Sequence, residues 1–193
     1  MAEKKVIVLL ADQASLDAGG DALKKFKKKA VVAANYTAGD VAGEARRVPG
    51  AVTAGPDGVA KALEDGAALV LVEMGDAAPE AVNAAVAAAL EAADRRTLVV
   101  LAANNLLAFY GLGINTKIGS IERAACARDV VPTLAHIADL PLADDATGAI
   151  LYQVLKETNL KLTELGKLKE ALSRMEAALQ RDNREPWDKH DCA

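Results

Sequence analysis

Four segments of the chain are continuous runs of aliphatic residues that do not alternate between apolar and polar positions. Such runs are typical of strands buried on both faces of a parallel sheet, because a half-exposed strand alternates. Segments with helical spacing lie between these runs, so strands and helices are predicted to alternate. The predicted strands are residues 5–11, 30–34, 68–73 and 97–103.

Helical spacing is found between the predicted strands and after the last of them. The predicted helices are residues 57–64, 79–93, 128–139 and 147–181. Proline precedes the first of these helices and opens the second, where a missing N–H costs nothing. The third contains Pro132, which a helix tolerates if it lies in the first turn. Residues 39–55 are rich in glycine and predict an irregular connection or a short edge element.

Strands alternating with helices predict an α/β fold in which a doubly wound, mostly parallel central sheet carries helices on both faces. A chain of 193 residues is long enough for one domain with a substantial core. We therefore assign residues 1–156 to an α/β domain. Residues 157–193 are assigned to a tail built around a long C-terminal helix.

Composition narrows the classes of partner. Aromatic residues make up 3% of the chain and the net charge is −4, which disfavours binding of nucleic acid by stacking or by a basic surface. The lysine-rich residues 24–29 are predicted to be a solvated helix face. No apolar run approaches the roughly 20 residues that span a bilayer, and the first residues do not resemble a signal peptide. A cytoplasmic protein without a membrane partner is expected.

The two cysteines, Cys126 and Cys192, lie far apart and have no CxxC spacing. Neither a metal knuckle nor a disulfide framework is indicated. Cys126 is predicted to be a small core residue, and Cys192 to be an exposed thiol near the C-terminus.

Residues 129–155 read DVVPTLAHIADLPLADDATGAILYQVL. This segment resembles the end of the alkaline phosphatase superfamily, in which a D-[IV]-x-P-T-[IL] helix runs into a GLP turn and a D-x-x-G-x-x-L stretch. The superfamily includes sulfatases, nucleotide pyrophosphatases and cofactor-independent phosphoglycerate mutases. The matching residues are Asp129, Pro132, Thr133 and Leu134, then Asp139, Leu140 and Pro141, then Asp145, Gly148 and Leu151.

Earlier segments resemble the same superfamily in the same order. Residues 5–15 resemble its opening strand, which ends in DG, and residues 69–78 resemble a strand followed by D-x-x-G-H. Residues 97–105 resemble the strand that ends in the metal-binding SDHG, and residues 109–114 resemble the YGPGI strand. The large middle portion of the superfamily is absent from this chain.

The resemblance implies chemistry in which two metal ions activate a Ser, Thr or Cys nucleophile. Asp12 matches the first metal ligand, and Asp76 matches the aspartate of D-x-x-G-H, whose histidine has no counterpart. The Asp-His pair of SDHG falls on Asn104 and Asn105. The late metal-binding histidine is missing from residues 117–128.

The chain's two histidines, His136 and His190, do not lie at ligand positions. His136 is expected to be structural. Coordination by two aspartates and two neutral amides does not offset the free energy that zinc or a similar ion loses when it gives up its water. No metal and no other cofactor is therefore expected, and the chain is interpreted as a pseudoenzyme.

Two interpretations of the matched positions remain open. Asp12, Asp76, Asn104 and Asn105 all follow predicted parallel strands, at the edge where ligands of open α/β sheets bind, so they are candidate ligand-binding residues for a small anionic ligand. Alternatively, the aspartates cap helices or turns and the asparagines form a tight turn.

The tail carries an apolar stripe at heptad spacing. Its members are Leu165, Leu168, Leu172, Met175 and Leu179. Residues spaced three and four apart lie on one face of a helix, and a leucine-rich face of this kind needs a partner. The stripe predicts a homo-oligomer, and packing of the stripe on its own domain is the alternative.

The predicted function is that of a non-catalytic, alkaline phosphatase-like module for binding or assembly. The first alternative is a phosphoester or sulfoester hydrolase or transferase with an altered metal site around Asp12 and Asp76. The second is a binder or sensor of a small phosphorylated ligand near Asn104.

Overall fold

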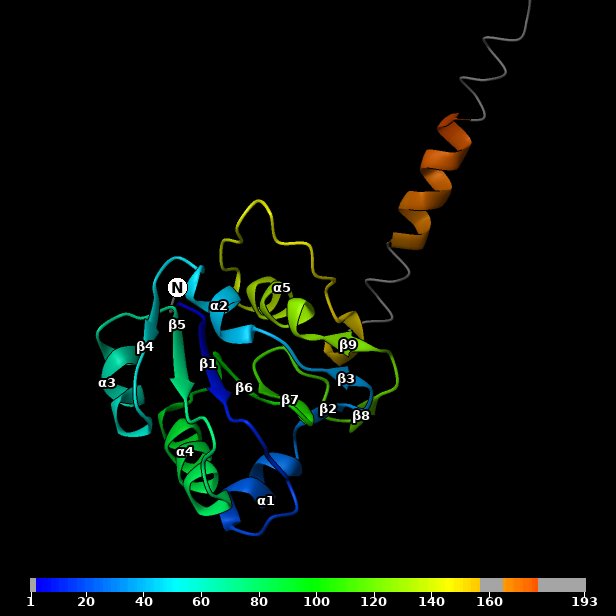
Figure 1. Cartoon of the computed structure of the whole chain (residues 1–193). Helices are drawn as coiled ribbons and strands as arrows, with labels where there is room; N and C mark the ends of the chain where they lie inside the picture. The colour runs from blue at the N-terminus through cyan, green and yellow to red at the C-terminus, as the bar shows by residue number, and fades with distance from the viewer. Residues whose placement is uncertain (1–2, 157–164, 177–193) are drawn as a thin grey trace, which may run out of the picture. The chain divides into compact units, whose positions relative to one another are not determined.

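The computed structural model describes residues 3–156 and 165–176. The chain divides into two units, Met1–Lys156 and Glu157–Ala193. The first unit is an α/β structure around a seven-stranded sheet with the order β4-β5-β1-β6-β7-β2-β8 (Figure 1). The strands of this sheet are β1 (Lys5–Leu10), β2 (Val31–Ala33), β4 (Ala51–Thr53), β5 (Leu69–Glu73), β6 (Thr97–Ala103), β7 (Leu106–Gly111) and β8 (Ser120–Ile121). A separate parallel pair joins β3 (Tyr36–Thr37) to β9 (Ala125–Cys126).

The helices of this unit fall between the strands. They are α1 (Asp21–Lys27), α2 (Val41–Arg46), α3 (Val59–Glu64), α4 (Pro79–Ala92) and α5 (Ala127–Ala138), with short 3-10 helices η1 (Pro56–Gly58) and η2 (Tyr152–Val154). Residues 39–55, predicted to be an irregular connection or a short edge element, contain the short helix α2 and the edge strand β4.

The centre of the sheet is parallel. β1 lies between β5 and β6 and runs parallel to both, with Val6 opposite Leu69 on one side and Leu98 on the other. Residues 6–9 of β1 are fully buried, so both faces of this strand are covered. This explains why its sequence does not alternate. The predicted mostly parallel sheet is confirmed, as are the four predicted strands.

Helices cover both faces of the sheet. Ile7 and Leu9 of β1 point into a core that includes Phe26 of α1 and Val82 of α4. The alternate residues of the same strand, such as Val8, belong to a second core beneath α2 and α5. Successive side chains of the strand point to opposite faces of the sheet, so they contribute to two separate cores, one on each face.

Antiparallel pairing enters the sheet through a hairpin. Asn104 and Asn105 connect β6 to β7, whose first pair is Ala103 with Leu106. β7 is also antiparallel to β2. Runs of buried aliphatic residues do not distinguish parallel from antiparallel neighbours, so this feature could not be predicted from the pattern alone.

The predicted helix from residue 147 is wrong over residues 147–156. The chain there is irregular as far as residue 151 and then forms η2. Two side chains of α5 accept hydrogen bonds from backbone N–H groups of this segment. Asp129 Oδ1 accepts from Ala149 N at 2.7 Å, and Thr133 Oγ1 accepts from Leu151 N at 3.0 Å. These N–H groups are satisfied outside a helix. We call Asp129, Thr133, Gly148, Ala149 and Leu151 the clasp.

Gly148 fits the clasp because it has no side chain. A Cβ placed on it would lie 1.8 Å from the carbonyl oxygen of Arg128. In a regular helix this carbonyl would accept from the N–H of residue 132, but Pro132 has no N–H. Pro132 lies inside α5 and not in its first turn, where a proline would have been tolerated. The glycine segment therefore packs against α5 where the proline interrupts its hydrogen bonding.

The described part of the second unit is a helix over residues 165–176. The described members of the predicted stripe are all exposed, with fractional exposures of 47% for Leu165, 63% for Leu168, 59% for Leu172 and 63% for Met175. Arg174 donates to Glu170 Oε1 at 2.5 Å one turn away. Leu179, His190 and Cys192 lie outside the described residues. Within the described ranges, no helix combines the length and the apolar character needed to cross a membrane.

Candidate ligand site at the carboxyl edge of the sheet

The central strands β1, β5 and β6 end at the same edge of the sheet. Asp12 N donates to Gly75 O at 2.8 Å, and Asn104 N donates to Asp12 O at 3.1 Å. These bonds extend the parallel pairing beyond the strands, so the exits of three strands are held side by side. Ligands of open α/β sheets bind at this edge.

The first hollow at this edge has a volume of about 220 Å³. We call it the Asp12 cleft. Its walls come from the exits of β1, β5 and β6 and from residues 36–42, which include the start of α2. Its polar lining residues are Asp12, Tyr36, Asp40, Glu73 and Asn104.

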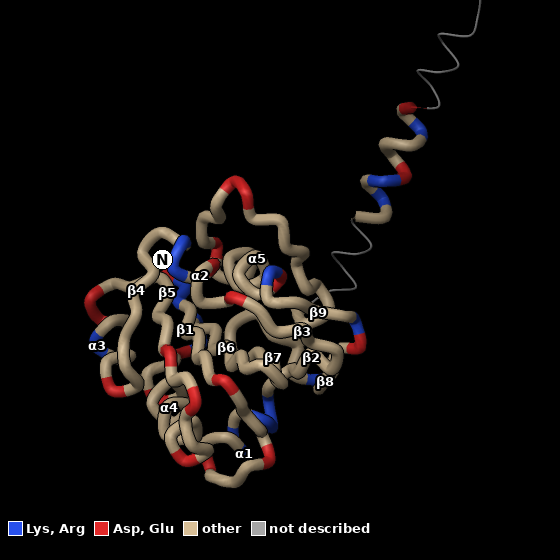
Figure 2. The backbone as a smooth tube through the Cα atoms, in the orientation of Figure 1, with Lys and Arg blue, Asp and Glu red and all other residues tan. Residues whose placement is uncertain are grey.

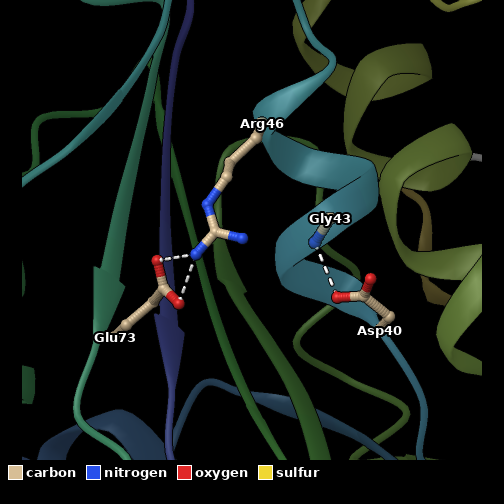
Figure 3. A network of polar contacts seen from close by, with 4 residues as sticks. All are labelled: Asp40, Gly43, Arg46 and Glu73. Carbon is tan, nitrogen blue, oxygen red and sulfur yellow. Dashed lines mark hydrogen bonds and ion pairs between the residues drawn. The ribbon is translucent and has the colours of Figure 1, made fainter.

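Two of its three carboxylates have partners within the protein. Arg46 on α2 reaches Glu73 at the end of β5, with Nη2 2.5 and 2.6 Å from the two carboxylate oxygens (Figure 3). Asp40 caps α2, since its Oδ1 accepts from Gly43 N at 2.7 Å (Figure 3). The carboxylate of Asp12 has no hydrogen-bond or ion-pair partner among the described residues, which leaves it free for a ligand.

The charge of the Asp12 cleft is negative. Its described lining includes the carboxylates of Asp12, Asp40 and Glu73 and no Lys or Arg side chain. Red acidic segments mark the exits of β1 and β5 in Figure 2. Burial, and secondarily the electrostatic influence of nearby Cys126, raises the pKa of Tyr36 to about 12, so its hydroxyl stays neutral. Because Arg46 pairs with Glu73, a phosphate in this cleft would meet the uncompensated carboxylates of Asp12 and Asp40.

The second hollow has a volume of about 500 Å³ and lies between the exit of β1 and the start of α4. We call it the Asp76 cavity. Its lining includes Gln13, Ser15, Asp76 and Asn105 together with apolar side chains of α1 and α4. Both amide atoms of Asn105 are engaged with Ala14, since Oδ1 accepts from its N–H at 3.1 Å and Nδ2 donates to its carbonyl at 2.9 Å.

The structure therefore divides the four predicted site residues into two pairs. Asp12 and Asn104 line one hollow, while Asp76 and Asn105 line the other. The predicted tight turn at the two asparagines is confirmed. Neither aspartate caps a helix, because the cap residue of α4 is Ala78 and that of α2 is Asp40.

Three polar residues of the Asp12 cleft were not predicted. Asp40 precedes a helix and has the residue type of an N-cap, a signal hidden by the glycine-rich sequence around it. Glu73 ends a strand that was predicted, but its pairing with Arg46 depends on where α2 lies above the sheet. Tyr36 reaches the cleft through the small β3–β9 sheet, which has no sequence signature.

Other candidate residues have structural surroundings. The rings of His136 and Tyr152 meet edge to face with centroids 5.5 Å apart, as expected for a structural histidine. Cys126 is half-buried at the N-cap of α5, so its predicted place in the core is wrong. Across residues 3–156 and 165–176, no group of three or more His, Cys, Asp or Glu side chains is arranged to hold a metal ion.

The lysines of the basic run are solvated, as predicted. Lys24, Lys25 and Lys27 lie on α1 and are exposed, and Lys28 and Lys29 follow them, also exposed (Figure 2). Lys27 pairs with Asp17 at 2.5 Å.

Comparison of this chain with protein-family models, with curated proteins and with solved structures found no match. The likeness to the alkaline phosphatase superfamily therefore rests on the sequence motifs alone.

Proposed function

We propose that this protein binds a small molecule at the carboxyl edge of its sheet and does not hydrolyse phosphate or sulfate esters. The separation of the matched positions into two hollows carries the proposal. Two-metal hydrolysis needs ions about 3.5–4 Å apart that share one set of ligands. Here Asn105 binds the backbone of Ala14, and Asp12 and Asp76 line different spaces.

The proposal includes descent from the alkaline phosphatase superfamily with loss of catalysis. The motif residues of the clasp support it, because they have structural roles that do not depend on metal. Asp139 also supports it, since it takes a left-handed conformation with φ of 57° where the superfamily's GLP turn has glycine. Likewise Gly111 has φ of 99°, and a Cβ there would lie 2.4 Å from Thr97 O. The structural positions of the motifs are thus retained or, at Asp139, keep the left-handed conformation. Of the positions that carry the chemistry, Asp12 and Asp76 are retained, Asn104 and Asn105 replace the Asp-His pair, and the metal-binding histidines have no counterpart.

An ester-hydrolysis screen tests this proposal. Purified protein is assayed with p-nitrophenyl phosphate, bis-p-nitrophenyl phosphate and p-nitrophenyl sulfate in the presence of zinc, manganese or magnesium. We expect no turnover above background and no difference between the wild type and Asp12→Ala. Turnover that disappears in Asp12→Ala, together with about one bound metal per chain, would favour the hydrolase alternative.

A second candidate function is self-association through the helix at residues 165–176. The four exposed apolar side chains on it favour this role, because they form one heptad face. The remaining positions are charged or small, as on a solvated surface. We propose that the partner of this face is the same helix of a second copy, which makes the protein a homo-oligomer. The cytoplasmic location and the lack of nucleic-acid and membrane partners stay predictions.

Neighbouring substitutions test self-association. Leu172→Glu places a charge on the stripe, and Ser173→Glu places the same charge on the next residue, outside the stripe. Light scattering at micromolar concentration should show an oligomer for the wild type and Ser173→Glu, and a monomer for Leu172→Glu. A monomeric wild type, or an oligomer that survives Leu172→Glu, would show that the stripe is not the assembly element.

A further inference from the structure

The walls of the Asp76 cavity are held in place by hydrogen bonds from three directions. The loop after β1 is tied to the β6–β7 turn by the two bonds between Ala14 and Asn105. The loop after β5 is tied to β1, since Met74 N donates to the carbonyl of the last residue of β1 at 2.9 Å. Asn83 of α4 accepts from Leu23 N of α1 at 3.2 Å and joins the two helices. The cavity is therefore formed before any ligand arrives.

The inner surface of this cavity is apolar. Leu23 and Val82 are 1% and 2% exposed, and they are joined there by Ala14, Ala77 and Pro79. The volume of about 500 Å³ lies within the roughly 300–1,000 Å³ of small-molecule sites, which have mainly apolar linings and a few polar groups. Leu23 and Val82 are already shielded from water, so a small apolar body would remove water mainly from the exposed lining side chains of Ala18, Ala78 and Pro79.

One carboxylate stands beside this apolar surface. Among the described residues that line the cavity, Asp76 alone carries a charge, and its carboxylate has no hydrogen-bond or ion-pair partner in the described part of the chain. Ser15 accepts from Asp17 N at 3.2 Å, which leaves its hydroxyl proton available for donation. The ligand group that best complements a free carboxylate is an ammonium, because a charge-assisted hydrogen bond is stronger than a neutral one.

We propose that the Asp76 cavity binds a small amphipathic amine. The apolar body lies on Ala18, Ala78 and Pro79, and the ammonium group donates to Asp76. This inference rests on the proposed function, because it names the ligand class for the same edge of the sheet. The Asp12 cleft, smaller at about 220 Å³, supplies an internal control with a free carboxylate of its own.

Three probes of similar size separate charge from shape. They are 2-phenylethylamine, 2-phenylethanol and 3-phenylpropanoate, titrated into the full chain by calorimetry and followed by amide chemical shifts. We expect the amine to bind most tightly and the carboxylate most weakly. Asp76→Asn should weaken amine binding about three- to fivefold, as expected for one solvent-accessible ion pair, and leave binding of the alcohol unchanged.

Two further variants locate the binding site. Asp12→Asn alters the other hollow and should leave amine binding unchanged. Ala18→Trp fills the Asp76 cavity from an exposed lining position and should block the amine and the alcohol without disturbing the core.

The inference is overturned if the amine does not bind, if it binds no more tightly than the carboxylate, or if its binding is insensitive to either Asp76→Asn or Ala18→Trp. Amine binding that is lost only in Asp12→Asn would also overturn it, while the proposed function would stand. Metal-dependent ester hydrolysis would refute the proposed function whatever the result with the amine.

Discussion

The clasp and the carboxyl edge use polar side chains in opposite ways. In the clasp, Asp129 is 9% exposed and Thr133 is fully buried, and the oxygens of both accept backbone N–H groups. At the carboxyl edge, Asp12 and Asp76 are exposed and their carboxylates have no partner within the described residues. Polar residues of a motif that are fully satisfied inside the protein maintain its architecture. Unsatisfied ones beside a hollow are available to a ligand.

Gly148→Ala gives the sharpest test of this comparison. The added Cβ would lie 1.8 Å from Arg128 O, so either the clasp or α5 must move. We expect a loss of about 3 kcal/mol in the free energy of unfolding, measured with urea. Gly55→Ala is the control, because nothing lies within 4 Å of a Cβ at that position, and it should change stability by less than about 0.5 kcal/mol. Equal effects of the two substitutions would show that the close approach is unimportant.

Asp129→Ala should have the next largest effect. It removes the acceptor of the N–H groups of Cys126 and Ala149, which Asp129 holds at 3.0 and 2.7 Å. We expect a loss of about 2 kcal/mol in urea unfolding, because two backbone donors would lose their acceptor in a part-buried setting. Asp129→Asn keeps one acceptor oxygen and should lose clearly less. If alanine and asparagine are equivalent, the hydrogen bonds do not stabilise the clasp.

A smaller effect is expected in acid. Hydrogen bonds from Arg47 and from Lys4 hold the pKa values of Asp145 and Asp139 below the ordinary 3.8. A carboxyl with a lowered pKa in the folded state stabilises the protein above its ordinary pKa, and this stabilisation is lost as the pH falls through the lowered value. The wild type should therefore lose more unfolding free energy between pH 6 and pH 3 than Asp139→Asn/Asp145→Asn.

Both ion pairs are exposed, so about 0.5 M salt should shrink the difference between the wild type and this double variant. Asp12→Asn serves as the control and should follow the wild type over the same range of pH. A double variant with the same acid loss as the wild type would mean that neither pair stabilises the fold.

The smallest effects on stability should come from the carboxyl edge. Asp12→Asn and Asp76→Asn remove charges that have no partner in the described structure, so each should change the unfolding free energy by less than about 0.5 kcal/mol. Their effect is expected on ligand binding instead. A loss of 2 kcal/mol in either variant would show that the carboxylate has a structural role, and the contrast with the clasp would fail.

Much of the fold could be predicted from the sequence. The central strands are encoded locally, because a strand buried on both faces must be aliphatic along its whole length. The start of α4 was predicted for a similar reason, since Pro79 favours the first turn whatever surrounds it. Residues 147–156 were predicted wrongly, because N–H groups of this segment bond to Asp129 and Thr133, which are distant in sequence. Helix propensity is a local property, so it does not include the competition between helical hydrogen bonds and these distant side-chain acceptors.

The sequence by itself determined which residues reach the carboxyl edge, because Asp12, Asp76 and Asn104 each follow a strand and parallel strands end together. Only the tertiary structure decided how they are grouped. The bonds of Asn105 to Ala14 and the position of α2 beside Glu73 separate the edge into two hollows. Such a grouping depends on packing between segments that are tens of residues apart. That a polar residue follows a strand can instead be read directly from the sequence. The type of residue at the edge is thus a local property, and the shape of the space it faces is not.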